Sequence, residues 1–317
     1  MAPTANKRVA AMVQTFKVRS WSKFEKIYEQ RFRPKRGVYY YRGQSNDSWD
    51  LQTTHERLFS RICGHIPTEQ PYPSYTPRNQ ASTRGSRIEL LALRAFQARS
   101  TRFLSNLPTF GDTLEWLALM RHWGMPTRLM DVTTSPYVAL YFALCDRLGV
   151  STVKPTNAAV WAISHTPLRC VASRAVGLPD HTDLSDPDLF DKLLIYPRKL
   201  MVAPVHPRTH NERLAAQQGT FLCVGDPDHS FSENLLGCMP GKEVKDQSLL
   251  YKFVIDHRAA PEILGRLSTM NIHQASLFPD LGGYARFIEN SLVLFGMRGS
   301  YNEGADWESL ERLGWLG

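Results

Sequence analysis

Three separated polar clusters hold the side chains best suited to chemistry in this 317-residue sequence. The first is Arg42 in YYYRGQS, the second is Arg128 with Asp131 in PTRLMDVTTSP, and the third is Gln217 in AAQQGTF. The planar guanidinium of arginine binds phosphate and carboxylate groups through paired hydrogen bonds. Burying charges such as Arg128 and Asp131 is costly unless they are paired or functional. The residue types are equally compatible with recognition of an anionic ligand and with ion pairs that fix the fold.

The stretch that carries Arg42 is predicted to be a strand that ends in a turn. GVYYYRGQ (37–44) is aromatic up to Arg42, and Gly43 follows directly. A ligand phosphate could approach the backbone at Gly43, and Gln44 completes the candidate set here. The alternative is that Arg42 pairs with a carboxylate, such as Asp131 or Asp47, and only fixes the fold.

The second cluster is predicted to lie on a short strand between two helices. TLEWLALMRHWG (113–124) has helical character and a terminating glycine, and Ser135 followed by Pro136 is a strong helix start. On a strand, Asp131, Thr133 and Ser135 share one face, so this face could line a cleft.

Two alternatives remain open for this cluster. Thr133 and Ser135 could serve only as caps of the following helix. Asp131 could pair with Arg128 or Arg42, and the three charges would then form a buried ionic network that fixes one core. Such a network would predict no ligand and severe destabilisation when any member is lost.

The third cluster lies where a helix is predicted to give way to a strand. NERLAAQQG (211–219) is helical up to its glycine, and GTFLCVG (219–225) has the apolar character of a strand. Gln217 stands at this junction. The alternative is a plain helix end with surface glutamines.

The remaining elements predict a mixed α+β fold, with a helical N-terminal half and a strand-rich C-terminal half. Further helices are expected at 20–32, 86–104, 186–195, 260–270 and 281–296, and further strands at 157–164, 199–205 and 248–256. We expect one domain, divided into an N-terminal helical segment (1–36), the main domain (37–295) and a C-terminal tail (296–317).

Composition narrows the class of protein. The net charge is +8 with a sequence pI near 9.3, which favours anionic partners such as nucleic acid or a phosphorylated small molecule, although a basic solvated surface would give the same balance. Five scattered cysteines without C-x-x-C spacing predict reduced thiols and a cytoplasmic location. No apolar run is long enough to span a membrane. Pro207 between His206 and His210 argues against a metal site there.

The same motifs resemble the FRG domain family. YYYRGQSNDSWDLQTTHERL, LMRHWGMPTRLMDVTTSPYVALYFA, NERLAAQQGTF and SLFPDLGGYARFI follow the family's order between Val38 and Ile288. Tyr41-Arg42-Gly43 stands at the Phe-Arg-Gly stretch that names the family. Arg121 stands where the family usually has glutamine, and Val132 where it usually has tryptophan.

A second resemblance is to ADP-ribosyltransferases of the toxin type, which implies a split-sheet fold and NAD as substrate. YYRG is similar to their aromatic-Arg-Gly strand, and DVTTSPYVALYFA to their Ser-Thr-Ser strand and following helix. The resemblance implies that Arg42, Gly43, Gln44, Arg128, Thr133 and Ser135 contact NAD, with Asp131 and Gln217 as catalytic candidates. Gln217 stands where that family has a glutamate, and an amide cannot supply a full negative charge to a developing cation.

Two classes of function follow from these resemblances. The leading hypothesis is an NAD-using ADP-ribosyltransferase-like enzyme, a toxin or antiphage effector that modifies nucleic acid or protein. The other is a non-catalytic FRG module that binds a nucleotide or nucleic acid. Release of nicotinamide from NAD separates the two.

Overall fold

The computed structural model describes residues 5–33, 38–65, 84–148, 156–195, 199–209, 211–239 and 249–297. Most of the tail predicted at 296–317 lies outside these residues.

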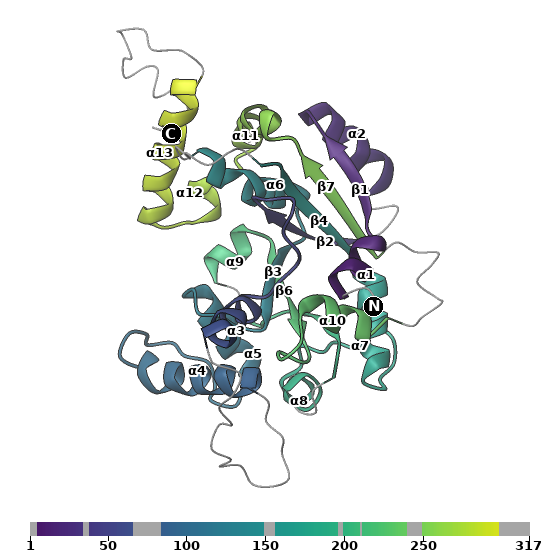
Figure 1. Ribbon diagram of the computed structural model, residues 1–317. Coiled ribbons are helices and arrows are strands. Elements are labelled where there is room, and N and C mark those ends of the chain that lie inside the picture. Colours follow the sequence, from purple (N-terminus) through teal and green to yellow (C-terminus); the bar gives the residue numbers. More distant parts are fainter. Residues whose placement is uncertain are drawn as a thin grey trace.

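A mixed sheet of seven described strands runs through the molecule (Figure 1). The strands are β1 (Gln14–Val18), β2 (Tyr39–Gln44), β3 (Leu129–Thr133), β4 (Ala158–Ser164), β5 (Val202–Val205), β6 (Gly219–Val224) and β7 (Leu250–Ile255). Their order is β1-β7-β4-β2-β3-β6-β5. The β1–β7 pair is parallel, and the other neighbouring pairs are antiparallel. The predicted α+β class is confirmed.

The sheet is divided between β2 and β3. These two strands are in register only at Tyr41 and Thr133. In contrast, β2 pairs with β4 over Tyr39 to Gln44, and β3 pairs with β6 along its whole length. The sheet therefore consists of two halves, β1-β7-β4-β2 and β3-β6-β5, which we call the large and small half-sheets.

The segment 1–36, expected to be helical, also contains a strand. It holds helices α1 (Ala5–Ala11) and α2 (Trp21–Arg31), but β1 lies between them and pairs with β7. Phe16 and Val18 are more buried than the residues beside them, which is the two-residue period of a strand. The signal is only five residues long and contains two apolar side chains, so long-range pairing with β7 rather than local preference fixes the strand.

One face of the large half-sheet is covered by α2, α6 (Pro136–Leu144) and α11 (Ala260–Thr269), which lie together in Figure 1. Helix α6 begins as predicted, because the Ser135 hydroxyl accepts a hydrogen bond from Val138 N and Pro136 opens the helix. It is apolar on all sides and almost entirely buried, as expected for a helix enclosed by a sheet and other helices.

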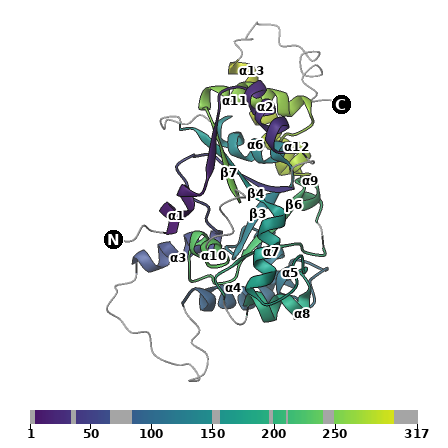
Figure 2. The ribbon, with the colours of Figure 1, turned by 90° about the vertical axis from the view of Figure 1, so that its right-hand side faces the viewer.

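Other helices cover the small half-sheet and the face of the sheet opposite to α2, α6 and α11. Helices α4 (Arg84–Ser100), α5 (Thr113–His122), α7 (His165–Ala175) and α8 (Pro187–Phe190) contribute to a core against β3, β5 and β6, and lie at the end of the molecule away from α2 and α11 (Figure 2). Helices α1 and α10 (Phe231–Gly237) pack on the opposite face.

The remaining helical segments are short or peripheral. They are α3 (Thr54–His65), α9 (Glu212–Ala216), α12 (Gln274–Leu277), α13 (Leu281–Met297), the 3₁₀ turns Cys145–Leu148 and His257–Ala259, and a π-helical turn at Asp191–Ile195. None of the helices in the described ranges is both long and apolar enough to cross a membrane.

Candidate functional site

A cavity of about 690 Å³ opens where the two half-sheets separate. Its walls come from β2, β3, β6, the end of α5, α9 and the loop before α5. Asp131 pairs with Phe221, and Thr133 with Gly219, so these residues share one face of the small half-sheet. All of them line the cavity. The volume is in the range typical of small-molecule sites.

Arg42 spans the division between the half-sheets. Its Nη1 donates to the backbone carbonyl of Asp131 at 2.6 Å and lies 3.8 Å from the Asp131 carboxylate. The backbone of β3 pairs with β2 only at Thr133, so the Arg42 side chain provides a hydrogen-bond donor for the Asp131 carbonyl, which lies outside that pair. The Nε of Arg42 is buried and has no hydrogen-bond partner among the described residues. Arg42 therefore keeps donor capacity next to the cavity.

Asp131 is held by the last turn of α5. Arg121 donates to Asp131 Oδ2 from Nε at 2.8 Å and from Nη2 at 2.6 Å. Within the described part of the chain, no donor is recorded for Oδ1. The alternative that Asp131 pairs with Arg128 is not what the structure has, since Arg121 takes that place.

The cavity carries an excess of positive charge. Arg42, Arg121 and Arg213 line it, and Arg57 is close enough to influence both Arg42 and Arg121. Burial lowers the pKa of Arg42 to about 10, Asp131 opposes that change, and Arg57 and Arg121 lower the pKa further. Burial likewise lowers the pKa of Arg213. The guanidinium groups outnumber the two carboxylates that line the cavity, Asp131 and Glu115, and a bound anion would relieve their mutual repulsion.

Thr133 and Gln217 connect β3 to the turn between α9 and β6. Thr133 Oγ1 donates to Gln217 O at 2.8 Å, and Thr134 N donates to Gln218 O at 3.0 Å. Gln218 has φ of 46°, the left-handed conformation that ends the helix. The Gln217 side chain lines the cavity and donates from Nε2 to Leu277 O at 3.0 Å. Its Oε1 is then the atom available to a ligand hydroxyl.

His122 lies in the cavity wall as a neutral imidazole. Asn211 Oδ1 accepts from Leu214 N at 2.7 Å, which fixes the amide so that Nδ2 donates to His122 Nδ1 at 3.2 Å. Burial lowers the pKa of His122, and Arg213 lowers it further. The neutral ring therefore carries its proton on Nε2 and can act as a hydrogen-bond donor.

Of the eight residues predicted for the site, five line this cavity: Arg42, Gly43, Asp131, Thr133 and Gln217. Gln44, Arg128 and Ser135 do not line it. Gln44 accepts a hydrogen bond from Trp161 Nε1 and donates one to Asp50 O, and Ser135 caps α6. Their predicted contact with a cofactor has no support in this arrangement.

Arg128 belongs to the core. Arg128 Nε and Nη2 bond Glu89 Oε2 at 2.6 and 2.5 Å, and Arg128 N donates to Glu89 Oε1 at 2.8 Å. Arg128 Nη1 donates to Leu194 O at 2.7 Å. The Arg128 and Glu89 side chains are 3% and 5% exposed. Arg128 lowers the pKa of Glu89, so both groups stay charged. The pair fixes the start of β3 against α4.

Gly43 is explained by packing. A Cβ at this position would lie 2.1 Å from Ala139 O and 2.6 Å from Ala143 N, both in the backbone of α6. The Arg-Gly dipeptide thus combines a side chain at the cavity with a site where a helix crosses the strand closely. The expected approach of a phosphate to Gly43 has to come from the cavity side.

Sequence reasoning did not propose Glu115, Arg121, His122 and Arg213 as site residues, although all four line the cavity. Glu115 accepts from Arg208 N and Thr209 N and so anchors the neighbouring loop. Arg121 and His122 end α5 within the same motif as Asp131, and their helical position one turn before the strand was the available signal. No sequence signal pointed to Arg213, because it reaches the cavity only through the placement of α9.

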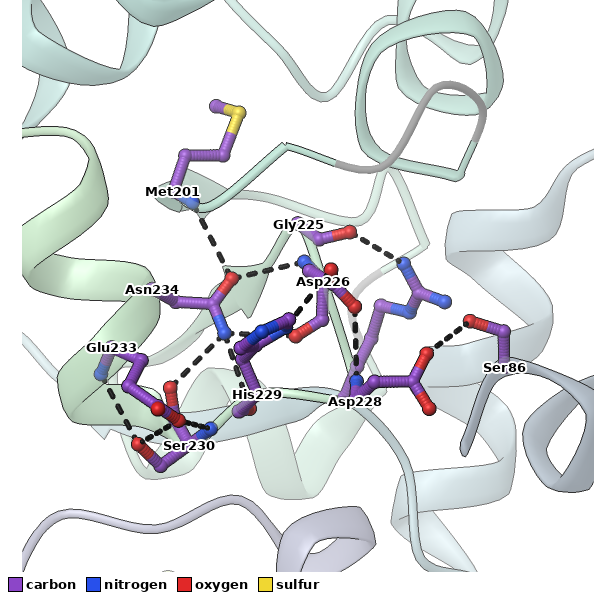
Figure 3. Close-up of polar contacts among 10 residues, drawn as sticks. Ser86, Met201, Gly225, Asp226, Asp228, His229, Ser230, Glu233 and Asn234 are labelled. Atoms are coloured by element: carbon purple, nitrogen blue, oxygen red, sulfur yellow. Dashed lines mark hydrogen bonds and ion pairs between the residues drawn. The ribbon is translucent and has the colours of Figure 1, made fainter. Parts of the chain in front are cut away.

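A second polar cluster lies outside the cavity, in the loop after β6 (Figure 3). Asn234 Oδ1 accepts from Met201 N and Asp226 N, and Asn234 Nδ2 donates to three carbonyls of the loop. Ser230 and Glu233 form a capping box at the start of α10. These contacts satisfy the cluster internally, so we assign it to the fold and not to ligand binding.

Comparison with protein families finds one match, to a segment in the N-terminal half of this chain. Residues 37–150 match the model of the FRG domain family. This stretch contains Arg42, Arg121, Asp131 and Thr133 but ends before Arg213 and Gln217, so it is shorter than the span expected from the motifs. No curated protein and no solved structure matches the chain.

Proposed function

We propose that this chain, which carries an FRG domain at residues 37–150, binds NAD in the cavity between the half-sheets and acts as an ADP-ribosyltransferase-like enzyme. The observation that carries the proposal is the gathering of Arg42, Arg121 and Arg213 around Asp131. The two carboxylates that line the cavity, Asp131 and Glu115, do not balance these cations, and a pyrophosphate group would do so.

The residues present fit a dinucleotide. Arg42 lines the cavity, and its guanidinium would bind a phosphate oxygen through the donors left beside its bond to Asp131 O. His122 offers a neutral donor, while Asp131 Oδ1 and Gln217 Oε1 offer acceptors for ribose hydroxyls. The division of the sheet also agrees with the split sheet implied by the resemblance of the sequence to ADP-ribosyltransferases.

The reaction that NAD would supply is glycosyl transfer. The bond between ribose C1′ and the nicotinamide nitrogen would break, and nicotinamide would leave with the electron pair. An oxygen or nitrogen of the acceptor would form the new bond to C1′ and lose its proton to water. Asp131 would stabilise the positive charge that develops on the ribose, and Arg42 would hold the pyrophosphate. Arg121 neutralises part of the charge of Asp131 and thereby limits this stabilisation. A chain that consumes NAD in this way would suit the role of a toxin or antiphage effector.

A non-catalytic nucleotide-binding module is the second candidate. Two observations favour it. Gln217 is an amide whose Nε2 already donates to Leu277 O, and the Asp131 carboxylate is already paired with Arg121. The two catalytic candidates therefore supply no free carboxylate. Both candidates predict binding, so the test is turnover. Purified protein is titrated with NAD by calorimetry and then assayed for nicotinamide release. Binding with release supports the enzyme, and binding without release supports a nucleotide-binding module. No binding contradicts both of these and leaves the module that binds nucleic acid.

A further inference from the structure

Three large aromatic side chains are exposed in the chain segments that also supply one wall of the cavity, although none of the three lines it. Phe103, Phe110 and Trp123 are 81%, 77% and 58% exposed, and we call them the aromatic rim. Single exposed aromatic residues are common and need no explanation. The aromatic rim differs from such single residues because its three members are close in sequence to residues that line the cavity. Leu107 and Pro108 lie between Phe103 and Phe110, and His122 precedes Trp123.

The segments that carry the rim form one structural unit. Phe103 and Phe110 lie in the loop between α4 and α5, and Trp123 follows the last residue of α5. Trp116 Nε1 on α5 donates to Thr109 O in the loop at 3.0 Å. Gln97 on α4 donates to Phe110 O at 3.4 Å. In both ribbon views α4 and α5 lie together at the same end of the molecule (Figures 1 and 2).

The charge of this unit is positive. Residues 84–124 contain six arginines and three acidic residues. The acids are occupied: Glu89 pairs with Arg128, Asp112 caps α5, and Glu115 accepts from the backbone of Arg208 and Thr209. Arg94, Arg99 and Arg102 are exposed on α4 and at the start of the loop. An anionic partner with flat apolar groups matches this surface.

We infer that the aromatic rim and these arginines bind a single-stranded nucleic acid, which presents its bases to the rim and serves as the acceptor at the cavity. Unstacked bases stack on aromatic side chains, and their phosphates contact arginine. A duplex keeps its base faces covered and cannot use the rim. A protein partner would not require the surplus of arginine, and it becomes an outcome of the test.

The acceptor role rests on the proposed function, whereas strand binding does not. In the transfer step, an acceptor oxygen or nitrogen of the strand forms a bond to ribose C1′. The bond from C1′ to the nicotinamide nitrogen breaks, nicotinamide leaves with the electron pair, and the acceptor proton passes to water. The Trp123 ring contacts the His122 ring, and His122 lines the cavity, so a base stacked on Trp123 would lie next to the cavity.

The first experiment measures strand binding without NAD. Fluorescence anisotropy of the full chain is recorded with labelled oligouridylate, oligothymidylate and a duplex of the same length. We expect both single strands to bind more tightly than the duplex. Trp123→Ala and Phe110→Ala should each weaken single-strand binding about tenfold, the usual effect of one lost stacking contact. Arg99→Ala with Arg102→Ala should reduce the salt dependence.

Trp49→Ala is the matched control, since Trp49 is 52% exposed but lies outside the arginine-rich segment 84–124 that carries the aromatic rim. It should bind the strand like the wild type. Preference for the duplex, or equal effects of the Trp49 and Trp123 variants, overturns the inference.

The second experiment adds NAD labelled in its adenylate part, together with the single strand and a pool of cell protein. Label on the strand supports the acceptor role, and label on protein alone overturns it. If nicotinamide is released but no strand binds, the acceptor inference fails while the proposed function stands. If the strand binds but NAD is not consumed, the proposed function and the acceptor role fail, and the binding surface stands.

Discussion

The Arg42 guanidinium donates to the backbone carbonyl of Asp131 at 2.6 Å, across the division between the two half-sheets. The same guanidinium remains 3.8 Å from the Asp131 carboxylate, which Arg121 holds at 2.6 Å. Arg42 therefore does not act mainly as the salt-bridge partner of Asp131. It connects the half-sheets through the main chain and keeps Nε next to the cavity, which is the arrangement that the proposed function requires.

Gly43 should tolerate no side chain. A Cβ there would collide with the backbone of α6 at Ala139 and Ala143, which cannot rotate away. Gly43→Ala should lower the free energy of unfolding by about 1–3 kcal/mol through overpacking. Gly111→Ala is the control, because nothing lies within 4 Å of its added Cβ. Urea denaturation of both variants measures the difference, and equal stabilities would contradict the close crossing of α6 over β2.

Glu89→Gln should destabilise the protein strongly without touching the cavity. The change leaves Arg128 charged and buried without its carboxylate, which costs about 3–5 kcal/mol. Replacing both residues, as Glu89→Leu with Arg128→Met, should recover part of this loss. Denaturation curves of the wild type, the single variant and the double variant measure the effect. A single variant as stable as the wild type would show that the pair does not hold β3 against α4.

Glu56 should make stability depend on pH. Burial raises the pKa of this carboxyl from 4.5 to about 7, although Phe231 N donates to it. The folded state therefore binds more protons than the unfolded state between pH 4.5 and 7, and stability falls as pH rises through this window. Glu56→Gln should be more stable than the wild type at pH 8, by on the order of 2 kcal/mol, and similar near pH 4.5.

The measurement for Glu56 is the free energy of unfolding of Glu56→Gln minus that of the wild type at each pH. The difference is used because other groups titrate over the same pH range. Glu29→Gln is the control, since Glu29 lies on the exposed surface and pairs there with Arg33. Its curve should run parallel to that of the wild type. A constant offset between Glu56→Gln and the wild type from pH 4.5 to 8 would contradict the raised pKa.

Arg213 should contribute to anion binding through charge. It lines the cavity, and its guanidinium lies 4.4 Å from the centre of the Phe278 ring. Arg213→Ala should weaken binding of ADP-ribose about tenfold and make it less sensitive to salt. Arg213→Lys should restore part of the affinity because the charge remains. Calorimetry at two ionic strengths measures both effects, and unchanged affinity in the alanine variant would remove Arg213 from the site.

The local signals around the site predicted more of the structure than the long-range ones. Ser135 and Pro136 marked the start of α6, and the glycine at 124 followed the end of α5, because caps act over a few residues. The partner of Arg128 could not be found this way. Glu89 lies on α4, far away in sequence, and only the packing of α4 brings it to β3.

The same distinction explains the cavity. Arg42, Asp131 and Thr133 were identified because charge and strand alternation are visible locally. Arg128 was placed with them by its nearness in sequence, yet it points into the core. The sequence did not predict Arg213 as a site residue, because it reaches the cavity through the placement of α9 beside β6. Sequence spacing could not show which of several nearby arginines the half-sheets would bring together.

The most direct test is nicotinamide release from NAD by the wild type, Arg42→Lys and Arg33→Ala. Lysine keeps the charge but loses Nε and the planar fork, whereas Arg33 is an exposed arginine outside the cavity. Thermal unfolding confirms that each variant is folded. We expect release by the wild type and by Arg33→Ala, and a loss of about 100-fold or more in Arg42→Lys. Equal release by Arg42→Lys, or none by the wild type, would contradict the proposed function.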